Sequence, residues 1–341
     1  MTVRDPLDLE ALRPWLRSDL GLEGKVVVRQ FSAGFSNLTY ALEVGGRTLV
    51  LRRPPPGADV KGGHDMGREV RVLTALRGHV PVPEVFAFDE AGGVLGVPFY
   101  VMEHVEGEIL RAPSKPPDAG MARAADALLD AFVVLHRVDL EAVGLADLGR
   151  PEGYVRRQVE GWACRYDRAA TDKTGLGDVF AWLDENQPAE SGATLVHNDF
   201  KYDNVVFGPD LEAVRAVLDW ELATAGDPLM DLGSTLGYWV EPGDPAALRA
   251  VALSPTWWPG NPTRAGVVEA YQERTGLEVA HPTFYLAYGL AKLAVIAQQI
   301  YKRWTLGHAT DPRFGGLLEV VKACSGLAAQ AIERDRISDL G

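Results

Sequence analysis

The residues best suited to chemistry form one short stretch, His197-Asn198-Asp199-Phe200-Lys201-Tyr202-Asp203-Asn204, which is followed by Leu218-Asp219-Trp220-Glu221. The carboxylate of Asp199 is of the type that orients a hydroxyl group and accepts its proton. The amide oxygen of Asn204 and the carboxylate of Asp219 are hard oxygen ligands, which Mg²⁺ prefers. Transfer of a phosphoryl group from a nucleoside triphosphate needs these groups and little covalent chemistry besides. The spacing therefore predicts a phosphoryl-transfer site in which Asp199 is the catalytic base and Asn204 and Asp219 bind the metal.

The same stretch resembles the catalytic loop of the aminoglycoside phosphotransferase and choline kinase group, which are small-molecule relatives of the protein kinases. His197-Asn198-Asp199 is similar to the His-Gly-Asp of this group and to the His-Arg-Asp of protein kinases, and Asp219 matches the metal-binding Asp of the second signature. The resemblance covers most of the chain. Within the group the chain most resembles the phosphotransferase domains fused to, or encoded with, some acyl-CoA dehydrogenases, judged by Leu51-Arg52-Arg53-Pro54-Pro55-Pro56-Gly57 and Gly96-Val97-Pro98-Phe99-Tyr100-Val101-Met102-Glu103.

This resemblance implies ATP and Mg²⁺ as cofactors and assigns further residues around the loop. Lys201 falls where kinases place a lysine that neutralises the transferring phosphate, and a surface lysine is the alternative interpretation. His197 is expected to hold the loop in place rather than to act as a base. Asp231, in the motif Gly226-Asp227-Pro228-Leu229-Met230-Asp231-Leu232, is expected to brace the loop by accepting backbone hydrogen bonds. Asp227 has the structural interpretation of a helix N-cap followed by proline.

A serine-containing segment near the N-terminus is expected to cover the triphosphate. It lies between the first two predicted strands, where kinases carry a glycine-rich loop. Because it contains one glycine only, an ordinary hairpin turn is the alternative interpretation. Its candidate phosphate ligands are Ser32, Gly34, Ser36 and Asn37.

Arg52 stands where kinases carry the lysine of Val-Ala-Ile-Lys, and Glu69 on the following helix would be its carboxylate partner. Arg53 is a competing candidate for the phosphate contact. Alternation along the strand favours Arg52, because Val50 and Arg52 would share the face toward the cleft. An exposed arginine–glutamate pair without a role in binding is the alternative.

The segment Met102-Glu103-His104-Val105 lies where kinases form the hinge that binds adenine. The binding groups there belong to the backbone, so Glu103 and Val105 are expected to contact the base whatever their side chains are. Met102 has the alternative interpretation of a residue that fills a gap in the core.

The periodicity of apolar residues indicates the elements that position these groups. Short apolar runs alternate with turn signals in the first hundred residues, whereas helical spacing dominates beyond Asp118. This pattern predicts an α+β fold with an antiparallel five-stranded N-lobe that contains an inserted helix, and with a mainly helical C-lobe. The resemblance implies a protein-kinase-like bilobal arrangement, with residues 1–103 as the N-lobe and residues 104–341 as the C-lobe. The expected elements are strands at 26–31, 39–44, 48–52, 85–89, 99–103, 194–197, 205–207 and 214–218, and helices at 8–19, 68–76, 119–137, 152–170, after Pro228 and from Thr263 onward.

The composition limits the class of protein. With 34 basic and 47 acidic residues, the chain of 341 residues has a formal charge of -13, which disfavours a nucleic-acid partner. Its two cysteines, Cys164 and Cys324, have no zinc-binding or disulfide pattern, and a reducing cytoplasm fits this best. No apolar stretch reaches the length of about eighteen residues that a membrane span needs, so no membrane partner is expected. The longest, residues 284–300, carries Lys292 and is expected to be a buried helix. The residues do not specify an oligomeric state.

The predicted function is ATP-dependent transfer of the γ-phosphate to a hydroxyl group of a small-molecule acceptor. The resembled subgroup implies a hydroxyacyl compound or its CoA thioester, and aromatic residues indicate a partly apolar pocket. Acidic residues of the C-lobe keep open a polycationic aminoglycoside as the acceptor. A non-catalytic, pseudokinase-like nucleotide-binding module is an alternative of another class, which the arginine at position 52 and the single loop glycine keep open. The aromatic residues are Trp162, Tyr166, Tyr238, Trp239, Trp257 and Trp258, and the acidic residues are Asp139, Glu141, Asp147 and Glu152.

Overall fold

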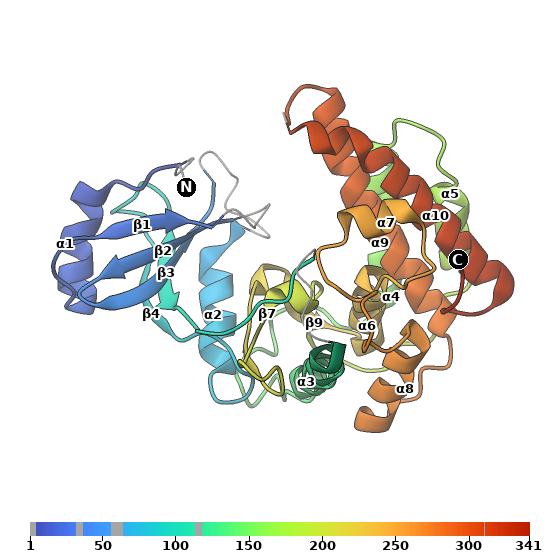
Figure 1. The fold of residues 1–341 in the computed structure, drawn as a ribbon, viewed down its shortest axis with the longest axis horizontal. Helices are drawn as coiled ribbons and strands as arrows, with labels where there is room; N and C mark the ends of the chain where they lie inside the picture. Colours follow the sequence, from blue (N-terminus) through green and yellow to red (C-terminus); the bar gives the residue numbers. More distant parts are fainter. Residues whose placement is uncertain (1–4, 32–36, 56–63, 113–117, 310) are drawn as a thin grey trace. The chain divides into compact units, whose positions relative to one another are not determined.

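The computed structural model describes residues 5–31, 37–55, 64–112, 118–309 and 311–341, and the chain divides into two compact units (Figure 1). The N-terminal unit comprises Met1–Gly107 and Arg215–Ala223, and the C-terminal unit comprises Glu108–Val214 and Thr224–Gly341. The N-terminal unit therefore extends beyond Glu103 and takes in the segment that carries Asp219. Among the described residues, the helices are all too short or too polar to cross a membrane.

The N-terminal unit contains a five-stranded antiparallel sheet. Its described elements before Gly107 are α1 (Leu9–Leu20), β1 (Val27–Gln30), β2 (Leu38–Val44), β3 (Arg47–Arg53), α2 (Met66–Leu76), β4 (Val85–Asp89) and β5 (Phe99–Glu103). The strand order is β1-β2-β3-β5-β4. Gly45 and Gly46, which join β2 to β3, have φ values of 58° and 75°. Such positive φ values are what a two-residue hairpin turn requires, and glycine adopts them without strain.

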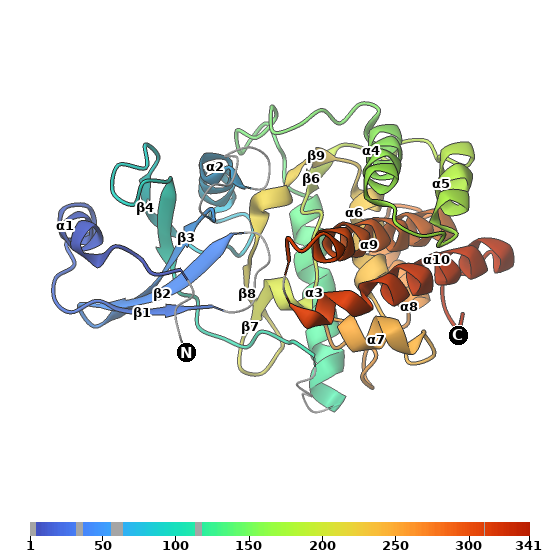
Figure 2. The ribbon, with the colours of Figure 1, turned by 90° about the horizontal axis from the view of Figure 1, so that it is seen from above.

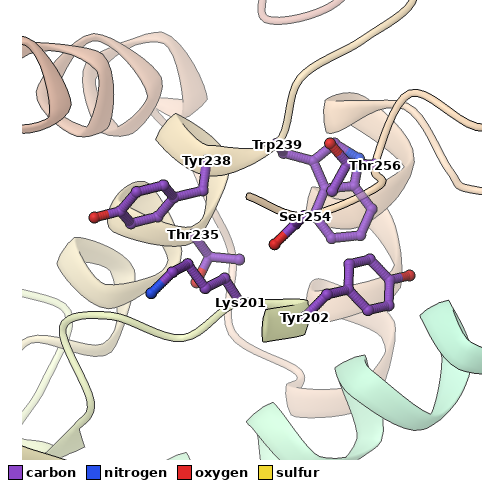
Figure 3. A pocket seen from close by; sticks show the side chains of 7 residues that line it. All are labelled: Lys201, Tyr202, Thr235, Tyr238, Trp239, Ser254 and Thr256. Atoms are coloured by element: carbon purple, nitrogen blue, oxygen red, sulfur yellow. The ribbon is translucent and has the colours of Figure 1, made fainter. Parts of the chain in front are cut away.

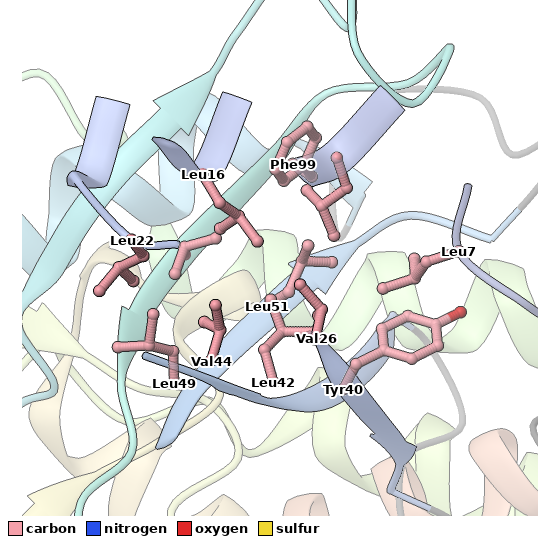
Figure 4. Packing of buried hydrophobic residues seen from close by; sticks show 12 residues of the cluster. Leu7, Leu16, Leu22, Val26, Tyr40, Leu42, Val44, Leu49, Leu51 and Phe99 are labelled. Atoms are coloured by element: carbon pink, nitrogen blue, oxygen red, sulfur yellow. The ribbon is translucent and has the colours of Figure 1, made fainter. Parts of the chain in front are cut away.

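One face of this sheet packs against α1 and the other face lies toward α2, and Arg52 is on the face toward α2. Alternate side chains of a strand point to opposite faces. Leu49 and Leu51 of β3 pack with Leu16 of α1 in a buried apolar cluster (Figure 4). Arg52 lies on the other face, where its guanidinium contacts Glu69 of α2. Because burial of apolar surface stabilises the cluster by about 25 cal/mol per Å², the packing against α1 also fixes the direction of Arg52.

The C-terminal unit is mainly helical (Figure 2). Its longest helix, α9 (Pro282–Thr305), packs against α6 (Pro228–Tyr238), α4 (Tyr154–Ala169) and α10 (Leu317–Arg334). A short antiparallel pair, β6 (Thr194–Val196) and β9 (Thr224–Gly226), leads into the loop that carries Asp199. The other elements of the described residues are α3 (Asp118–His136), α5 (Leu176–Glu185), η2 (Tyr202–Asn204), β7 (Val205–Phe207), β8 (Val214–Val217), η3 (Trp220–Leu222), α7 (Ala246–Val251), α8 (Arg264–Thr275) and η4 (Pro312–Gly316).

Glycines bring the backbones of α6 and α9 into direct contact. A β-carbon added to Gly233 of α6 would lie 2.7 Å from the carbonyl oxygen of Tyr285, and one added to Gly289 of α9 would overlap the carbonyl oxygen of Gly233. No other residue type fits at this separation without displacing a helix. The contact holds α6, which carries Asp231, against α9, which carries Lys292.

These elements confirm the α+β class predicted from the sequence, including the five-stranded antiparallel sheet, the helix inserted after β3 and the mainly helical second part. The predicted N-terminal strands and helices begin and end close to the observed bounds. Asp227 caps α6, since its carboxylate accepts from the backbone N–H of Leu229 at 2.8 Å, and Pro228 occupies the first helical turn.

Candidate active site

The catalytic loop follows β6 and ends in η2. Asn198 has a φ of 66°, in the left-handed region that asparagine tolerates better than most residues. This turn places the carboxylate of Asp199 beside Lys201 and Asn204. The ammonium group of Lys201 hydrogen-bonds to Asp199 Oδ2, and Asn204 Nδ2 donates to the same oxygen at 2.8 Å and to the Asp199 carbonyl at 2.9 Å. Three of the predicted site residues therefore meet at one carboxylate.

The surroundings of Asp199 keep its carboxylate ionised. Burial alone would raise the pKa of Asp199, but the charges of Lys201, His197 and Lys292 and the hydrogen bond from Lys201 hold this pKa below its ordinary value. An ionised carboxylate accepts a hydrogen bond from a hydroxyl group and orients it. Lys201 is itself buried, and its Nζ lies 5.1 Å from the ring centroid of Tyr238, so it is not a surface lysine.

Asp231 of α6 holds the start of the loop. Its buried carboxylate accepts from the backbone N–H of His197 at 2.6 Å and from that of Asn198 at 2.7 Å, and it lies 3.2 Å from Nε2 of His136. His197 is also buried, and its Nδ1 accepts from the backbone N–H of Asp199 at 3.2 Å. Both side chains therefore act on the conformation of the loop backbone.

Replacement of Asp231 by Asn should destabilise the protein by about 3 kcal/mol, because the amide cannot accept all three hydrogen bonds and would place its own N–H groups against theirs. Burial alone would raise the pKa of Asp231, but His136 and His197 hold it below its ordinary value. The stabilisation by the ionised carboxylate is therefore complete above the unfolded-state pKa of about 4 and is lost as the pH falls through the lower pKa of the folded state.

Urea unfolding at neutral and acidic pH measures this effect. The difference in free energy of unfolding between wild type and Asp231→Asn should shrink in acid. An equal difference at both pH values would show that the charge of Asp231 does not contribute.

Arg52 forms the centre of a charged cluster in the N-terminal unit. Its Nε donates to Glu69 Oε2 at 3.0 Å, its Nη2 donates to Glu221 Oε2 at 2.9 Å, and Nη2 also contacts Asp219 Oδ1. Burial opposes the charge, but the surrounding carboxylates raise the pKa of Arg52 well above its ordinary value. The side chains of Arg52 and Glu69 are only 11% and 2% exposed. They are not the exposed ion pair that was the alternative interpretation.

Arg53 lies on the opposite face of β3. Its Nη2 donates to the hydroxyl of Tyr40 at 3.2 Å and pairs with Asp5 Oδ1 at 3.0 Å. Tyr40 belongs to the apolar cluster that packs under α1. The two arginines therefore have separate surroundings, and Arg52 is the one that contacts Asp219.

Glu221 has a contact that its place in the sequence motif did not reveal. Its carboxylate accepts from Arg52 and, at 2.7 Å, from Nδ2 of Asn37. The Oδ1 atom of Asn37 lies 2.9 Å from Nδ1 of His64. Asn37, predicted as a phosphate ligand, is thus joined to the Arg52 cluster through Glu221. In the sequence, the feature that could have indicated this role of Glu221 is that it is a second acidic residue two positions after Asp219.

The predicted metal ligands, Asp219 in the N-terminal unit and Asn204 in the C-terminal unit, each carry oxygen atoms of the kind that hard divalent cations prefer. Asp219 has a φ of 67° and a side chain that is 32% exposed, and the three carboxylates around Arg52 exceed its single positive charge. Asn204 uses its amide nitrogen for Asp199, which leaves its amide oxygen as a ligand atom. No group of three or more His, Cys, Asp or Glu side chains in the described part of the chain is arranged to hold a metal ion. Mg²⁺ commonly takes several of its ligands from substrate phosphates and water.

The other predicted nucleotide ligands are only partly described. Ser32, Gly34 and Ser36 lie outside the described residues. Glu103 is the last residue of β5, and its backbone N–H donates to the carbonyl of Glu84 at 2.8 Å. Val105 follows in a segment without regular secondary structure. The contacts of Glu103 and Val105 with adenine stay predictions.

A small recess beside Lys201 combines aromatic rings and hydroxyl groups (Figure 3). Ser254 on its wall donates to Asp203 Oδ1 at 3.0 Å. Two of the aromatic residues predicted for an acceptor pocket, Tyr238 and Trp239, therefore lie next to a predicted catalytic residue. The lining residues are Lys201, Tyr202, Thr235, Tyr238, Trp239, Ser254 and Thr256.

Lys292 contacts the catalytic loop, although the sequence motifs did not include it. Its Nζ donates to the carbonyl of Asn198 and to Ser234 Oγ, the latter at 3.0 Å, and the residue is 3% exposed. The same Nζ lies 5.8 Å from the ring centroid of Trp162, and the guanidinium of Arg165 lies 4.4 Å from that ring. The signal in the sequence was a lysine inside an otherwise apolar helical stretch.

Comparison with known proteins indicates the family and the fold of the chain. A model of the phosphotransferase enzyme family matches residues 27–265. Acyl-CoA dehydrogenase family member 11 of Gallus gallus is 37% identical over 88% of this chain, and the chain spans only 39% of that protein. A Ralstonia eutropha protein named as a candidate aminoglycoside phosphotransferase is 32% identical, with a TM-score of 0.81 and coverage of 96% of this chain and 99% of its own. A thermostable mutant of aminoglycoside phosphotransferase APH(4)-Ia, solved with ADP and hygromycin B, shares the fold at 16% identity, with a TM-score of 0.60 and coverage of 94% and 98%. These structures confirm the predicted kinase-like fold.

Proposed function

Because the chain belongs to the phosphotransferase enzyme family, we propose that it transfers the γ-phosphate of ATP to a hydroxyl group of a small molecule. The observation that carries this proposal is the half-buried carboxylate of Asp199, which Lys201 and Asn204 contact on a loop braced by Asp231. The ADP complex of APH(4)-Ia supports a nucleotide as the phosphate donor.

The proposed roles follow from the charges and donors of each residue. Asp199 orients the acceptor hydroxyl and accepts its proton, and Lys201 neutralises charge on the transferred group. Asn204 and Asp219 would hold Mg²⁺, which when bound neutralises charge on the phosphate oxygens. Since phosphoryl transfer needs little covalent work from the protein, positioning and fixed charges would supply most of the rate.

The N-terminal unit would hold the nucleotide. Arg52, fixed by Glu69, offers a forked cation to the α- and β-phosphates, a geometry that suits phosphate oxygens. Ser32, Gly34, Ser36 and Asn37 are proposed to cover the phosphates, and the backbone of Glu103 and Val105 to bind adenine.

Replacement of Lys201 by Met should lower kcat by about 10–100-fold, because a positive charge is lost next to the transferring phosphoryl group. The affinity for Mg-ATP should change much less. Loss of Lys201 should also raise the pKa of Asp199, so the acid limb of the kcat profile should move to higher pH. Steady-state kinetics and calorimetric titration with Mg-ATP measure both effects. Lys201→Arg, which keeps the charge, is the control. A rise in the KM for ATP with unchanged kcat would contradict the catalytic role.

For the acceptor we propose a hydroxyacyl compound, free or as its CoA thioester. The name of the Gallus gallus relative supports an acyl-CoA context. In the C-terminal unit, the guanidinium of Arg165, an exposed residue, lies 4.4 Å from the ring of Trp162. An exposed cation beside an apolar ring suits an acceptor with an acyl chain and negative charge better than a polycation, which it would repel. The acidic residues that kept an aminoglycoside open, Asp139, Glu141, Asp147 and Glu152, are exposed.

An assay of Mg-ATP consumption over a panel of acceptors tests the proposal. The panel contains hydroxyacyl thioesters, hydroxy acids, aminoglycosides, choline-like amines and sugars, and each product is identified by mass spectrometry. ADP formation with a phosphorylated hydroxyacyl product supports the proposal. Phosphorylation of aminoglycosides alone would overturn the proposed acceptor. Thermal stabilisation by Mg-ATP without turnover of any acceptor would favour a binding module.

The two cysteines support the proposed cytoplasmic location. Cys164 is exposed, Cys324 is buried, and both are free thiols. Free thiols of this kind persist most readily in a reducing compartment.

A further inference from the structure

A buried lysine of α9 contacts the backbone of the catalytic loop. Lys292 is the residue whose Nζ donates to the carbonyl of Asn198 and to Ser234 Oγ. Ser234 in turn donates to the carbonyl of Met230 at 3.1 Å, so the lysine links α9 to α6 and to the loop. A charged side chain is rarely buried to this extent because it loses its hydration. Its presence among the apolar residues 284–297 of α9 therefore calls for a specific role.

The residue that Lys292 contacts is held at three separate points. The backbone N–H of Asn198 donates to Asp231 of α6, and its side-chain Oδ1 accepts from the hydroxyl of Tyr154 of α4 at 3.0 Å. Its carbonyl accepts from Lys292 of α9. Asn198 has a positive φ, so the loop needs such contacts to keep its turn. The carbonyl of Asn198 and the N–H of Asp199 belong to one peptide group, so Lys292 fixes the peptide from which the carboxylate of Asp199 projects.

Lys292 also acts on Asp199 through its charge. Burial lowers the pKa of Lys292 to about 8, against the opposing effects of Asp199 and Asp231. The charged groups that face it are Asp199 and Lys201 from the catalytic loop, Asp231 from α6 and Arg165 from α4. The protonated form of Lys292 donates a charge-assisted hydrogen bond to the carbonyl of Asn198.

Given the phosphotransferase activity proposed above, we propose that Lys292 is a positioning residue, whose side chain orients the Asn198–Asp199 peptide for catalysis. The role is distinct from that of Lys201, because Lys292 reaches the reacting groups only through the loop.

Lys292→Met tests this role, because methionine has a similar length and fills buried space without a charge. The expected result is a fall in kcat of about 10–100-fold with a nearly unchanged KM for ATP, as expected when a reacting group is misplaced. The kcat of the wild type should fall as the pH rises through about 8, where Lys292 loses its proton. This limb should be absent in Lys292→Met and restored, at least in part, in Lys292→Arg.

A readout independent of turnover is the amide ¹⁵N chemical shift of Asp199. In the wild type it should titrate with an apparent pKa near that of Lys292, about 8, and in Lys292→Met it should not. The matched control is Lys302→Met, because Lys302 of the same helix also donates to a carbonyl, that of Arg168, and has no contact with the catalytic loop. The control should leave kcat, its pH profile and the Asp199 shift unchanged.

The outcomes separate this proposal from the proposed function. A wild type without turnover for any acceptor would overturn the proposed function. The pH dependence of the Asp199 amide ¹⁵N shift would still decide whether Lys292 orients the Asn198–Asp199 peptide. An active wild type whose kcat and pH profile survive in Lys292→Met would overturn the positioning role. So would a variant with a lower melting temperature and unchanged kinetics, because that result identifies Lys292 as a purely structural residue.

Discussion

Replacing Asp199 by Asn is expected to lower kcat by about 10³–10⁴-fold, because the amide does not accept the proton of the acceptor hydroxyl. The affinity for Mg-ATP should be nearly unchanged. The amide is isosteric and its oxygen still accepts from Lys201 and Asn204, so the loop should keep its structure. Steady-state kinetics with an active acceptor, together with nucleotide titration, measure the two effects separately.

Asp203→Asn is the matched control for this experiment. Asp203 belongs to the same loop and accepts a hydrogen bond from Ser254. Because burial raises the pKa of Asp203, its neutral carboxylic acid is favoured more than that of Asp199, and an uncharged amide resembles this neutral form. Its replacement should reduce kcat far less than that of Asp199. Turnover that survives in Asp199→Asn would remove this residue from its proposed role, and equal losses in both variants would show that the loop responds to any change of charge.

The pH profile provides a second check on Asp199. Since Lys201, His197 and Lys292 hold its pKa below the ordinary value of about 4, the base stays ionised through the neutral range. The kcat of the wild type should therefore fall on the acid side only when the pH is below about 4.

Replacing Arg52 by Met is expected to lower kcat/KM for ATP by about 10²–10³-fold and to destabilise the protein by about 3–5 kcal/mol. The first effect reflects the loss of the phosphate contact. The second arises because Glu69, Asp219 and Glu221 all lose the cation that they share. Arg52→Lys should recover only part of the loss, since one ammonium group cannot reproduce the forked contacts of the guanidinium. Kinetics with ATP and urea unfolding provide the two measurements.

Arg53→Met is the control, because Arg53 is the neighbouring arginine on the opposite face of β3. Its contacts with Tyr40 and Asp5 predict some loss of stability and an unchanged KM for ATP. A raised KM in Arg53→Met, with Arg52→Met unaffected, would reverse the assignment of the two residues.

The sequence predicted the N-terminal sheet well because its signals are local. The double-glycine turn and the alternation in β2 and β3 act between residues that are neighbours in the chain. The short strand β9 has no such signal, since its three residues pair with β6 across a long stretch of sequence. Helix α5 was missed because its ten residues offer too few repeats for periodicity. The predicted helical region beyond Thr263 is divided into α8, α9, η4 and α10, with Gly276 and Gly307 at two of the breaks.

The candidate site shows the same division between local and distant information. Asp199, Lys201 and Asn204 were predicted together because one loop fixes their spacing. The partners of Arg52 and Asn198 come from segments far apart in the chain, and only the fold brings them together. Glu221 and Lys292 were therefore missed, although each broke a local pattern: one was a second acid in a short motif, and the other was a charge in an apolar helix.

The backbone contact between α6 and α9 extends genetic sensitivity to residues outside the catalytic motifs. Asp231 and Lys292 hold the same peptide region from these two helices, and their spacing depends on Gly233 and Gly289 remaining in touch. A single methyl group at either glycine would push α6 and α9 apart and so change the spacing between Asp231 and Lys292. Loss-of-function alleles should therefore arise at this helix pair with every motif residue intact.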